Sequence, residues 1–405
     1  MKTNSILIKT AFAGVTKVAA AFTAFFMTAA VTRTLGAEES GLFLLAVSIL
    51  AFSSVFFRLG LDNVVLRLIS AGQGSSKAIG AMSTGLMTSL VIGLLATLLI
   101  FVNVEFIAHQ VFSKAAFSNV FSIMIWALPF MLMFTLLSSG FQAYYRVTAV
   151  IWFQSLGLSS LFLIMCTIAY VLYGNAIFNV RYAAWFYVLS AMVTCIWALI
   201  AWHRQVKGNW GRPNFNDKHL WSSASNLWAA SAMSLAVQWS GVLIAAIFVS
   251  SSDIAFLSAA QRTAMLTSFV LMVVNMVVAP RYARLWQENK IEEIQRLAKW
   301  STRGMVMLAA PIVAAMVLLP DLIMGVFGDE FIVAGNLLAI MAIGQFINVA
   351  TGSVGYLLNM SGHERDFRRV TLFSGPLTVI LSFILIDQYG VLGAAIATAV
   401  GLSLQ

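Results

Sequence analysis

Long apolar stretches separated by short polar joints constrain the fold of this sequence more than any other feature. Hydrophobic residues make up 60% of the 405 residues and charged residues only 10%, whereas soluble domains are about 45–50% apolar. A helix of about 20 apolar residues crosses the ~30 Å hydrocarbon core of a membrane. The sequence therefore predicts an all-α integral membrane protein with about twelve transmembrane helices.

The predicted spans cover nearly the whole chain. They are residues 9–33, 41–66, 78–104, 117–143, 148–173, 180–203, 221–250, 253–281, 302–327, 332–360, 367–388 and 390–405. The first is too long for the core of a secretory signal, so we interpret it as an uncleaved span. The last is short, which indicates either a strongly tilted helix or one truncated at residue 405.

The basic residues are distributed asymmetrically between the joints. Eighteen of the 24 lysines and arginines lie on the side of the N-terminus, and only Arg33, Lys114 and Arg181 lie in the joints on the other side. Loops that remain in the cytoplasm carry such an excess of positive charge. We therefore expect a multi-pass protein of the cell inner (plasma) membrane with both termini in the cytoplasm. The net charge of +9 follows from this topology and does not indicate a nucleic acid partner.

A polar joint in the middle of the chain divides it into two halves. Residues 204–220, RQVKGNWGRPNFNDKHL, are rich in glycine, asparagine and charge, which is typical of a solvated cytoplasmic linker. This linker separates a predicted N-terminal six-helix lobe, residues 1–203, from a C-terminal six-helix lobe, residues 221–405. Six spans in each half predict two pseudo-symmetric lobes around a central cavity, related by an axis along the membrane normal.

A second cytoplasmic joint, residues 284–300, has apolar residues at helical spacing with Glu and Lys between them. The pattern predicts a short helix on the inner membrane surface, anchored by Trp286 and Trp300. A solvated connecting helix is the alternative.

The motifs of soluble enzymes are missing from the sequence. It contains no phosphate-binding P-loop, no G-x-S-x-G or H-E-x-x-H motif and no CxxC pair. The two cysteines, Cys166 and Cys195, both fall within predicted spans and suggest neither a disulfide framework nor a metal cluster. We therefore expect a protein that is not an enzyme, with no catalytic residues, no metal and no other cofactor.

Ionisable side chains inside the spans are candidate functional residues, because each is costly in lipid unless it faces a cavity or a partner. Arg262 lies nine residues after Asp253, about 13 Å into the eighth span, and Lys17 lies about 11 Å into the first. Arg58 lies near the inner end of the second span, where we expect it to snorkel and to pair with Asp62. A structural ion pair or a snorkelling cation is the alternative for each.

An amide adds a fourth candidate. Gln238 in the seventh span shares a helical face with Ser231, Ser234 and Gly241, although an interhelical hydrogen bond would also explain it. The candidate substrate-binding residues are Arg262, Lys17, Gln238 and Arg58. The deep charges among them are cations, which suit an anionic, hydroxyl-rich ligand better than an organic cation.

Several motifs resemble those of a known family. The stretches TRTLGAEESGLFLLAVSIL at 32–50 and RLGLDNVVLRLIS at 58–70 resemble the opening of bacterial polysaccharide-unit flippases, the O-antigen repeat-unit type. PRYARL at 280–285, LLPDLIMGVFGDEFIVAG at 318–335 and YGVLGAAIATAVG at 389–401 are similar too. The superfamily of these flippases also contains multidrug-and-toxin extruders and lipid II flippases.

The resemblance implies a flippase that moves undecaprenyl-pyrophosphate-linked oligosaccharide repeat units from the cytoplasmic to the periplasmic leaflet by alternating access. Such transport serves the biosynthesis of surface polysaccharide, including the O-antigen of lipopolysaccharide. It implies a polyprenyl-pyrophosphate-linked oligosaccharide and membrane lipid as ligands, and a polysaccharide polymerase and chain-length regulator proteins as partners. A central cationic cavity is expected of such proteins, and Lys17 and Arg262 would contribute to it.

Two alternatives remain. The first is a drug or cation antiporter of the same fold, but drug-extruding relatives commonly carry an acidic residue in the first span, and this first span has none. The second is an integral-membrane polysaccharide polymerase or ligase. Such enzymes usually carry their active site on one long periplasmic loop, and every predicted outer joint is short. Both observations favour the flippase.

Overall fold

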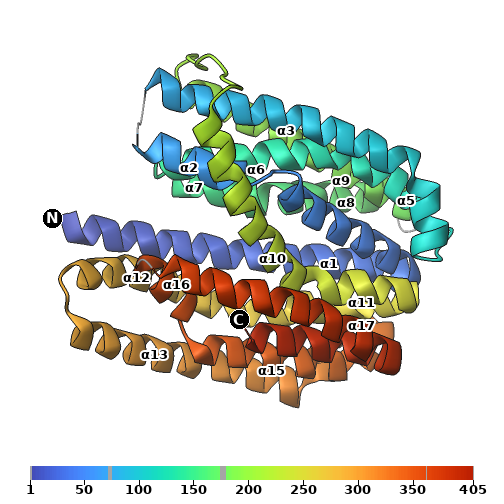
Figure 1. The fold of residues 1–405 in the computed structure, drawn as a ribbon. Helices are drawn as coiled ribbons and strands as arrows, with labels where there is room; N and C mark the ends of the chain where they lie inside the picture. The colour runs from blue at the N-terminus through green and yellow to red at the C-terminus, as the bar shows by residue number, and fades with distance from the viewer. Residues whose placement is uncertain (1, 72–74, 174–178, 362, 405) are drawn as a thin grey trace. The chain divides into compact units, whose positions relative to one another are not determined.

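The computed structural model describes residues 2–71, 75–173, 179–361 and 363–404, without some of the side chains inside these ranges. All regular secondary structure in these ranges is helical, as the sequence predicts (Figure 1). Apolar spans fold in this way because a helix satisfies every backbone polar group within one segment, which lipid cannot do. In the same ranges, nine helices are long and apolar enough to cross a membrane.

Two of these nine helices are each kinked at a glycine. Helix α1, Lys2–Phe56, contains Gly36 with a φ of 72°, and helix α17, Glu364–Ser403, contains Gly390 with a φ of 58°. Glycine adopts such positive φ values without the Cβ clash of other residues. Each of these helices therefore consists of two helical pieces. When the two pieces of each kinked helix are counted separately and the shorter apolar helix Gln238–Phe248 of α10 is added, the described residues are consistent with the twelve predicted helices.

The chain divides into two compact units, Ala19–Leu235 and Met1–Val18 with Ala236–Gln405. The Ala19–Leu235 unit contains most of α1 and the first part of α10 (Lys218–Phe248). Its other helices are α2 (Leu61–Ala71), α3 (Ser76–Val102), α4 (Val104–Phe106), α5 (Phe117–Met124), α6 (Leu128–Ala143), α7 (Val147–Ile151), α8 (Gly157–Tyr173) and α9 (Val180–Gln205). The second contains α11 (Ser251–Ala264), α12 (Ser268–Gln287), α13 (Ile291–Leu318), α14 (Pro320–Met324), α15 (Gly335–Thr351), α16 (Val354–Met360) and α17.

Aromatic side chains fill the core of the Ala19–Leu235 unit. The ring of Phe43 lies 5.6 Å from that of Phe162 and 5.9 Å from that of Tyr187. The ring of Phe141 on α6 lies 5.5 Å from that of the buried Trp202 on α9. Aromatic pairs at these separations add to the energy of burial. The Phe43 pairs stabilise the packing of α1 against α8 and α9, and the Phe141 pair stabilises the packing of α6 against α9.

Small and hydroxyl-bearing residues bring helices close together in the other unit. A Cβ atom on Gly344 of α15 would lie only 2.5 Å from the Cα of Ala399 on α17, so the two backbones are nearly in contact. The hydroxyls of Ser240 on α10 and Ser382 on α17 lie 3.3 Å apart and form a buried hydrogen bond. Close approach at small residues and interhelical hydrogen bonds are the usual means of packing helices in membranes.

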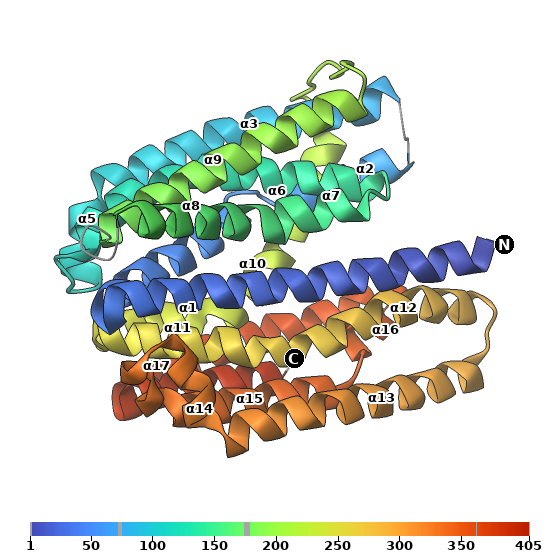
Figure 2. The ribbon, with the colours of Figure 1, turned by 180° about the vertical axis from the view of Figure 1, so that it is seen from behind.

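The structure corrects the surface helix predicted for residues 284–300. Helix α12 continues to Gln287, and α13 begins at Ile291 and runs without interruption into the ninth span (Figure 2). Within its first turns, Ile294 is buried against Val278 and Tyr282 of α12. The helical spacing in the sequence therefore marks a helix–helix contact.

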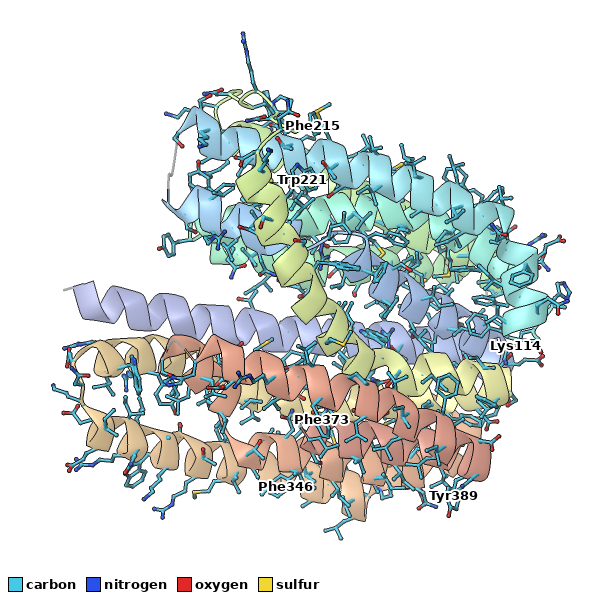
Figure 3. All side chains as sticks on the ribbon, in the orientation of Figure 1. Lys114, Phe215, Trp221, Phe346, Phe373 and Tyr389 are labelled. Carbon is cyan, nitrogen blue, oxygen red and sulfur yellow. The ribbon has the colours of Figure 1, made fainter. Side chains whose placement is uncertain are left out.

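The polar joint between α9 and α10 is docked on α3. We call residues 206–217 the strap. The backbone N–H of Asn214 donates a 2.8 Å hydrogen bond to the hydroxyl of Thr84 on α3. Where the strap meets α10, the indole of Trp221 donates a 2.8 Å bond to the carbonyl of Phe215, and Figure 3 shows both residues at this end of α10. The strap is therefore fixed to one helix rather than fully solvated.

Candidate functional site

The candidate site in the second unit is built around Arg262, near the end of α11. This helix begins with a capping box, in which the backbone N–H of Asp253 donates to the Ser250 hydroxyl at 3.1 Å and the Asp253 carboxylate accepts from the Ser250 backbone. Arg262 is half-buried and lies nine residues further on, about 13 Å along the helix axis. A short 3₁₀ segment, Met265–Thr267, follows and separates α11 from α12. Such mid-span segments often mark functional positions.

A hydrogen bond ties α11 to α10 beside this arginine. The side-chain amide of Gln261, which is buried, donates a 3.0 Å bond to the backbone carbonyl of Gln238. The side chain of Gln238 itself is exposed. The amide with the structural role is thus Gln261, and the amide predicted as a ligand, Gln238, has its side chain free of that contact.

Two further buried amides also connect helices. The hydroxyl of Ser268 donates to the Oε1 atom of Gln345 on α15, and the hydroxyl of Ser353 donates to the Oδ1 atom of Asn275 on α12. Both amide residues are at most 5% exposed. Their positions are explained by interhelical hydrogen bonding, and we do not assign them to a binding site.

The other two candidates, Lys17 and Arg58, lie in different units of the chain. Lys17 lies on α1 within Met1–Val18, and its side chain is outside the described part of the structure. Arg58 lies in the Ala19–Leu235 unit and is 6% exposed. Arg262 and Gln238 therefore lie on two helices of one unit that are joined by the Gln261 bond, whereas Arg58 lies in the other unit.

The predicted pair of Arg58 with Asp62 is confirmed. The Nη2 atom of Arg58 lies 3.4 Å from the Oδ2 atom of Asp62, and its Nη1 atom donates a 3.3 Å bond to the Ser54 hydroxyl. The expectation that Arg58 snorkels is wrong, because its guanidinium is buried. Within the described structure its Nε atom has no hydrogen-bond partner. A buried cation with one unused donor can still donate a hydrogen bond to an anionic group.

Arg58 lies in a helix break that the sequence analysis missed. Helix α1 ends at Phe56 and α2 begins at Leu61; between them Leu59 and Gly60 have φ values of 53° and 72°. The indole of Trp228 on α10 donates a 2.8 Å bond to the carbonyl of Phe56. Two features of the sequence could have indicated this break. Gly60 allows a positive φ inside a span, and the indole N–H of Trp228 needs a partner such as a free carbonyl when it is buried.

The two candidate side chains of the second unit carry hydrogen-bond donors, the groups that an anionic ligand would need. Arg262 supplies a guanidinium and Gln238 an amide, and both groups donate hydrogen bonds. Among the residues that the structure describes, no group of three or more His, Cys, Asp or Glu side chains could hold a metal ion.

Two family models match the chain. The model described as "Polysaccharide biosynthesis protein" matches residues 6–286, and the MatE model matches residues 230–384. Their overlap includes α11 and Arg262.

Two curated proteins of the archaeon Haloferax volcanii are similar in sequence. The chain is 28% identical over 219 residues to the "Probable low-salt glycan biosynthesis flippase Agl15", which covers 53% of this chain and 45% of that protein. It is 26% identical over 192 residues to the "Probable flippase AglR", covering 46% of this chain and 40% of that protein. The matches thus span less than half the length of either relative.

Solved transporter structures have the same fold. The lipid II flippase MurJ in an inward closed conformation matches with a TM-score of 0.74 and 13% identity, over 98% of this chain and 84% of that chain. An inward-facing multidrug resistance MATE family transporter of the MOP superfamily matches with a TM-score of 0.73 and 13% identity, over 96% and 94% of the two chains. At this identity the likeness establishes the fold alone.

Proposed function

Because the chain belongs to the polysaccharide biosynthesis protein family, whose model matches residues 6–286, we propose that it is a flippase for lipid-linked oligosaccharides. The names of two relatives, both flippases and one of glycan biosynthesis, support this proposal. The proposed substrate is an oligosaccharide repeat unit joined through pyrophosphate to undecaprenol. The protein moves it from the cytoplasmic to the periplasmic leaflet of the inner membrane for surface polysaccharide synthesis, including O-antigen and lipopolysaccharide.

The observation that carries the proposal is the position of Arg262. This guanidinium lies half-buried within a predicted span, next to the bond that fixes α11 to α10. A charge at this depth is costly unless it serves a cavity or a partner. In the proposed role, Arg262 binds the pyrophosphate through charge-assisted hydrogen bonds, and the exposed amide of Gln238 binds sugar hydroxyls.

Lys17 and Arg58 are proposed as further cations of the substrate path. Lys17 lies on the N-terminal part of α1, which belongs to the same unit as Arg262. Arg58 would present its unused Nε donor, provided that a ligand reaches the helix break. Its bond to Asp62 fixes the guanidinium before any ligand arrives.

The energetic need for such a protein follows from the substrate. A pyrophosphate with several sugar hydroxyls would lose many hydrogen bonds to water in bare hydrocarbon, at a cost of several kcal/mol for each polar group. Alternating access would let the headgroup exchange water for protein donors while the polyprenyl tail stays in lipid. No covalent bond is made or broken. A polysaccharide polymerase and chain-length regulators would act on the product after its transfer.

A second candidate, a drug or cation antiporter, is favoured by the match of the MatE model to residues 230–384. An organic cation would need an anionic ligand group. The candidate residues Arg262, Lys17 and Arg58 are positively charged, so they would repel an organic cation. Efflux of a cationic dye driven by a sodium or proton gradient would support the antiporter, and its absence with preserved polysaccharide export would support the flippase.

A deletion strain complemented with variants tests the proposed function. Without the gene, lipid-linked repeat units should accumulate facing the cytoplasm, and the wild-type gene should restore surface polysaccharide. Arg262→Gln should lower export about tenfold or more, because it removes a charged hydrogen-bond donor worth about 1.5–3 kcal/mol. Arg204→Gln at the exposed end of α9 is the matched control and should rescue fully.

The outcomes separate the site from the function. Full rescue by Arg262→Gln would overturn the role of Arg262 while leaving a flippase. A deletion strain without cytoplasm-facing repeat units would overturn the flippase itself.

A further inference from the structure

The adjoining ends of α12 and α13 form a pocket with a volume of about 820 Å³. The charge pattern places this end of the helices in the cytoplasm. Figures 1 and 2 both show the two helices side by side and joined by a short turn. Arg281 and Arg284 line the pocket from α12, and Arg296 and Trp300 line it from α13. None of these residues belongs to the proposed substrate site.

The turn that closes the pocket is tightly hydrogen-bonded. The backbone N–H of Asn289 donates to the carbonyl of Trp286, and that of Lys290 donates to the carbonyl of Leu285, both at 3.0 Å. Asn289 has a φ of 55°, a conformation that asparagine tolerates better than most residues. The buried contact of Ile294 with α12 holds the second wall in place. The pocket is therefore a built feature of the fold.

Within this turn, Glu288 uses its carboxylate to hold two of the cations. Its Oε1 atom accepts from the Nε atom of Arg284 at 2.7 Å, and its Oε2 atom lies 3.0 Å from the Nζ atom of Lys290. Lys290 also lies 3.6 Å from a carboxylate oxygen of Glu293. Hydrogen bonds from Arg284 and then Lys290 lower the pKa of Glu288, so this bridge stays ionised at neutral pH. Glu288 and Glu293 thus balance the charges of Arg284 and Lys290.

Two arginines of the lining remain outside this network. Arg281 and Arg296 are both exposed, and neither forms an ion pair with any residue that the structure describes. Glu292 is the remaining acidic residue of the lining. The pocket therefore offers two guanidinium groups, one from each helix, against one carboxylate.

Tryptophans place the pocket at the level of lipid headgroups. Trp300 lines it and is 68% exposed, and Trp286 on the other helix is 37% exposed. Tryptophan is enriched at the boundary between lipid and water, where its ring is apolar and its N–H meets polar groups. An occupant of this pocket would have its charged part beside the arginines and its apolar part beside Trp300.

We propose that this pocket binds the phosphate headgroup of an anionic phospholipid of the cytoplasmic leaflet. Basic pockets between transmembrane helices on this side of the membrane suit anionic headgroups, and two guanidinium groups can bind the phosphate oxygens through charge-assisted hydrogen bonds. The acyl chains pass Trp300 into the bilayer. The site does not depend on what the protein transports.

Lipid retention by the full-length protein tests the proposal. The protein is purified from nanodiscs of phosphatidylcholine containing phosphatidylglycerol, and the phospholipids that remain bound are measured by native mass spectrometry. Arg281→Gln/Arg296→Gln should lower the retained phosphatidylglycerol about 30-fold, since each of the two basic residues contributes about 1 kcal/mol near a membrane surface. Arg281→Lys/Arg296→Lys keeps both charges and should retain most of it.

The matched control is Arg204→Gln/Lys207→Gln, which removes two exposed charges, one at the C-terminal end of α9 and one in the strap, and should change retention less than twofold. Equal losses in the control and the test variant would overturn the proposal, because general surface charge would then explain binding. Displacement of the lipid by water-soluble glycerol phosphate at equal concentration would overturn it too, because the site would then bind a free anion. Because the four arginine and lysine side chains are exposed, their replacement should leave the fold intact, and the melting temperature of each variant checks this.

Discussion

The indole Nε1–H of Trp228 donates a hydrogen bond of 2.8 Å to the carbonyl oxygen of Phe56, the last residue of α1. The backbone N–H of Leu59 reaches the same oxygen at 3.3 Å, so the indole makes the shorter of the two bonds. The rings of Trp228 and Phe56 also contact each other edge to face, with centroids 5.2 Å apart. A carbonyl at a helix break inside a membrane needs such a partner, because lipid offers none. Trp228 therefore stabilises the break that contains Arg58.

Replacement of this tryptophan separates the hydrogen bond from the ring contact. Trp228→Phe keeps an aromatic ring and removes the donor, and it should lower the free energy of unfolding by about 1 kcal/mol. Trp228→Ala also removes the ring and should cost about 3–5 kcal/mol. Denaturant unfolding in detergent micelles measures both. A Phe variant as stable as the wild type would mean that the indole bond contributes nothing.

Removing one member of the buried pair of Arg58 and Asp62 should destabilise the protein more than replacing both members. Asp62→Asn leaves the buried guanidinium without its counter-charge and should lower the free energy of unfolding by about 3 kcal/mol. Arg58→Met/Asp62→Leu replaces both groups with apolar ones and should be closer to the wild type, because no charge is left unpaired. A double variant less stable than Asp62→Asn would contradict this account of the pair.

Much of the fold could be predicted because membrane spans are encoded locally. Length and apolar character located the helices, and the kinks at Gly36 and Gly390 fall at joints between predicted spans. The break at 57–60 could not be predicted in this way, because it lies inside a single predicted span, residues 41–66. The start of α13 was misinterpreted because helical spacing identifies an apolar face but not what covers it.

Tight packing at Gly344 predicts a strong effect of a single methyl group. Gly344→Ala would bring its Cβ to 2.5 Å from the Cα of Ala399, and it should lower the free energy of unfolding by about 1–3 kcal/mol. Gly304→Ala on α13 is the control, because a Cβ there meets nothing within 4 Å. The control should raise stability by about 0.5–1 kcal/mol through helix propensity. Unfolding curves in which both variants behave alike would contradict the close contact of α15 and α17.

The docked strap makes a similar prediction with a control of matched backbone conformation. Gly211 and Gly208 have φ values of 65° and 78°, so alanine is comparably strained at either position. A Cβ on Gly211 would lie 2.6 Å from the backbone N of Gly80 on α3, whereas a Cβ on Gly208 meets only His203, at 3.6 Å. Gly211→Ala should therefore be less stable than Gly208→Ala by about 1–3 kcal/mol. Equal melting temperatures would indicate that the strap is not packed on α3 in solution.

The candidate site was predictable only where it is local in sequence. Arg58 and Asp62 are four residues apart, and this spacing alone predicted their pairing, although Arg58 lies in the break before α2 and not on a helical turn. The bond from Gln261 to the carbonyl of Gln238 joins residues on two helices, and no periodicity in the sequence specifies which amide meets which carbonyl. Sequence spacing therefore identified the charged residues, while the packing of α10 and α11 determined which amide is structural.

Transport in proteoliposomes tests the central proposal most directly. A polyprenyl-pyrophosphate-linked oligosaccharide with a fluorescent sugar is incorporated into both leaflets, and a membrane-impermeant reductant added outside bleaches only the headgroups that reach the outer leaflet. Wild-type protein and Arg204→Gln should allow nearly complete bleaching. Arg262→Gln should slow the second, protein-dependent phase about tenfold or more. Bleaching that stops at the outer-leaflet half with the wild-type protein, as in empty vesicles, would contradict the proposed function.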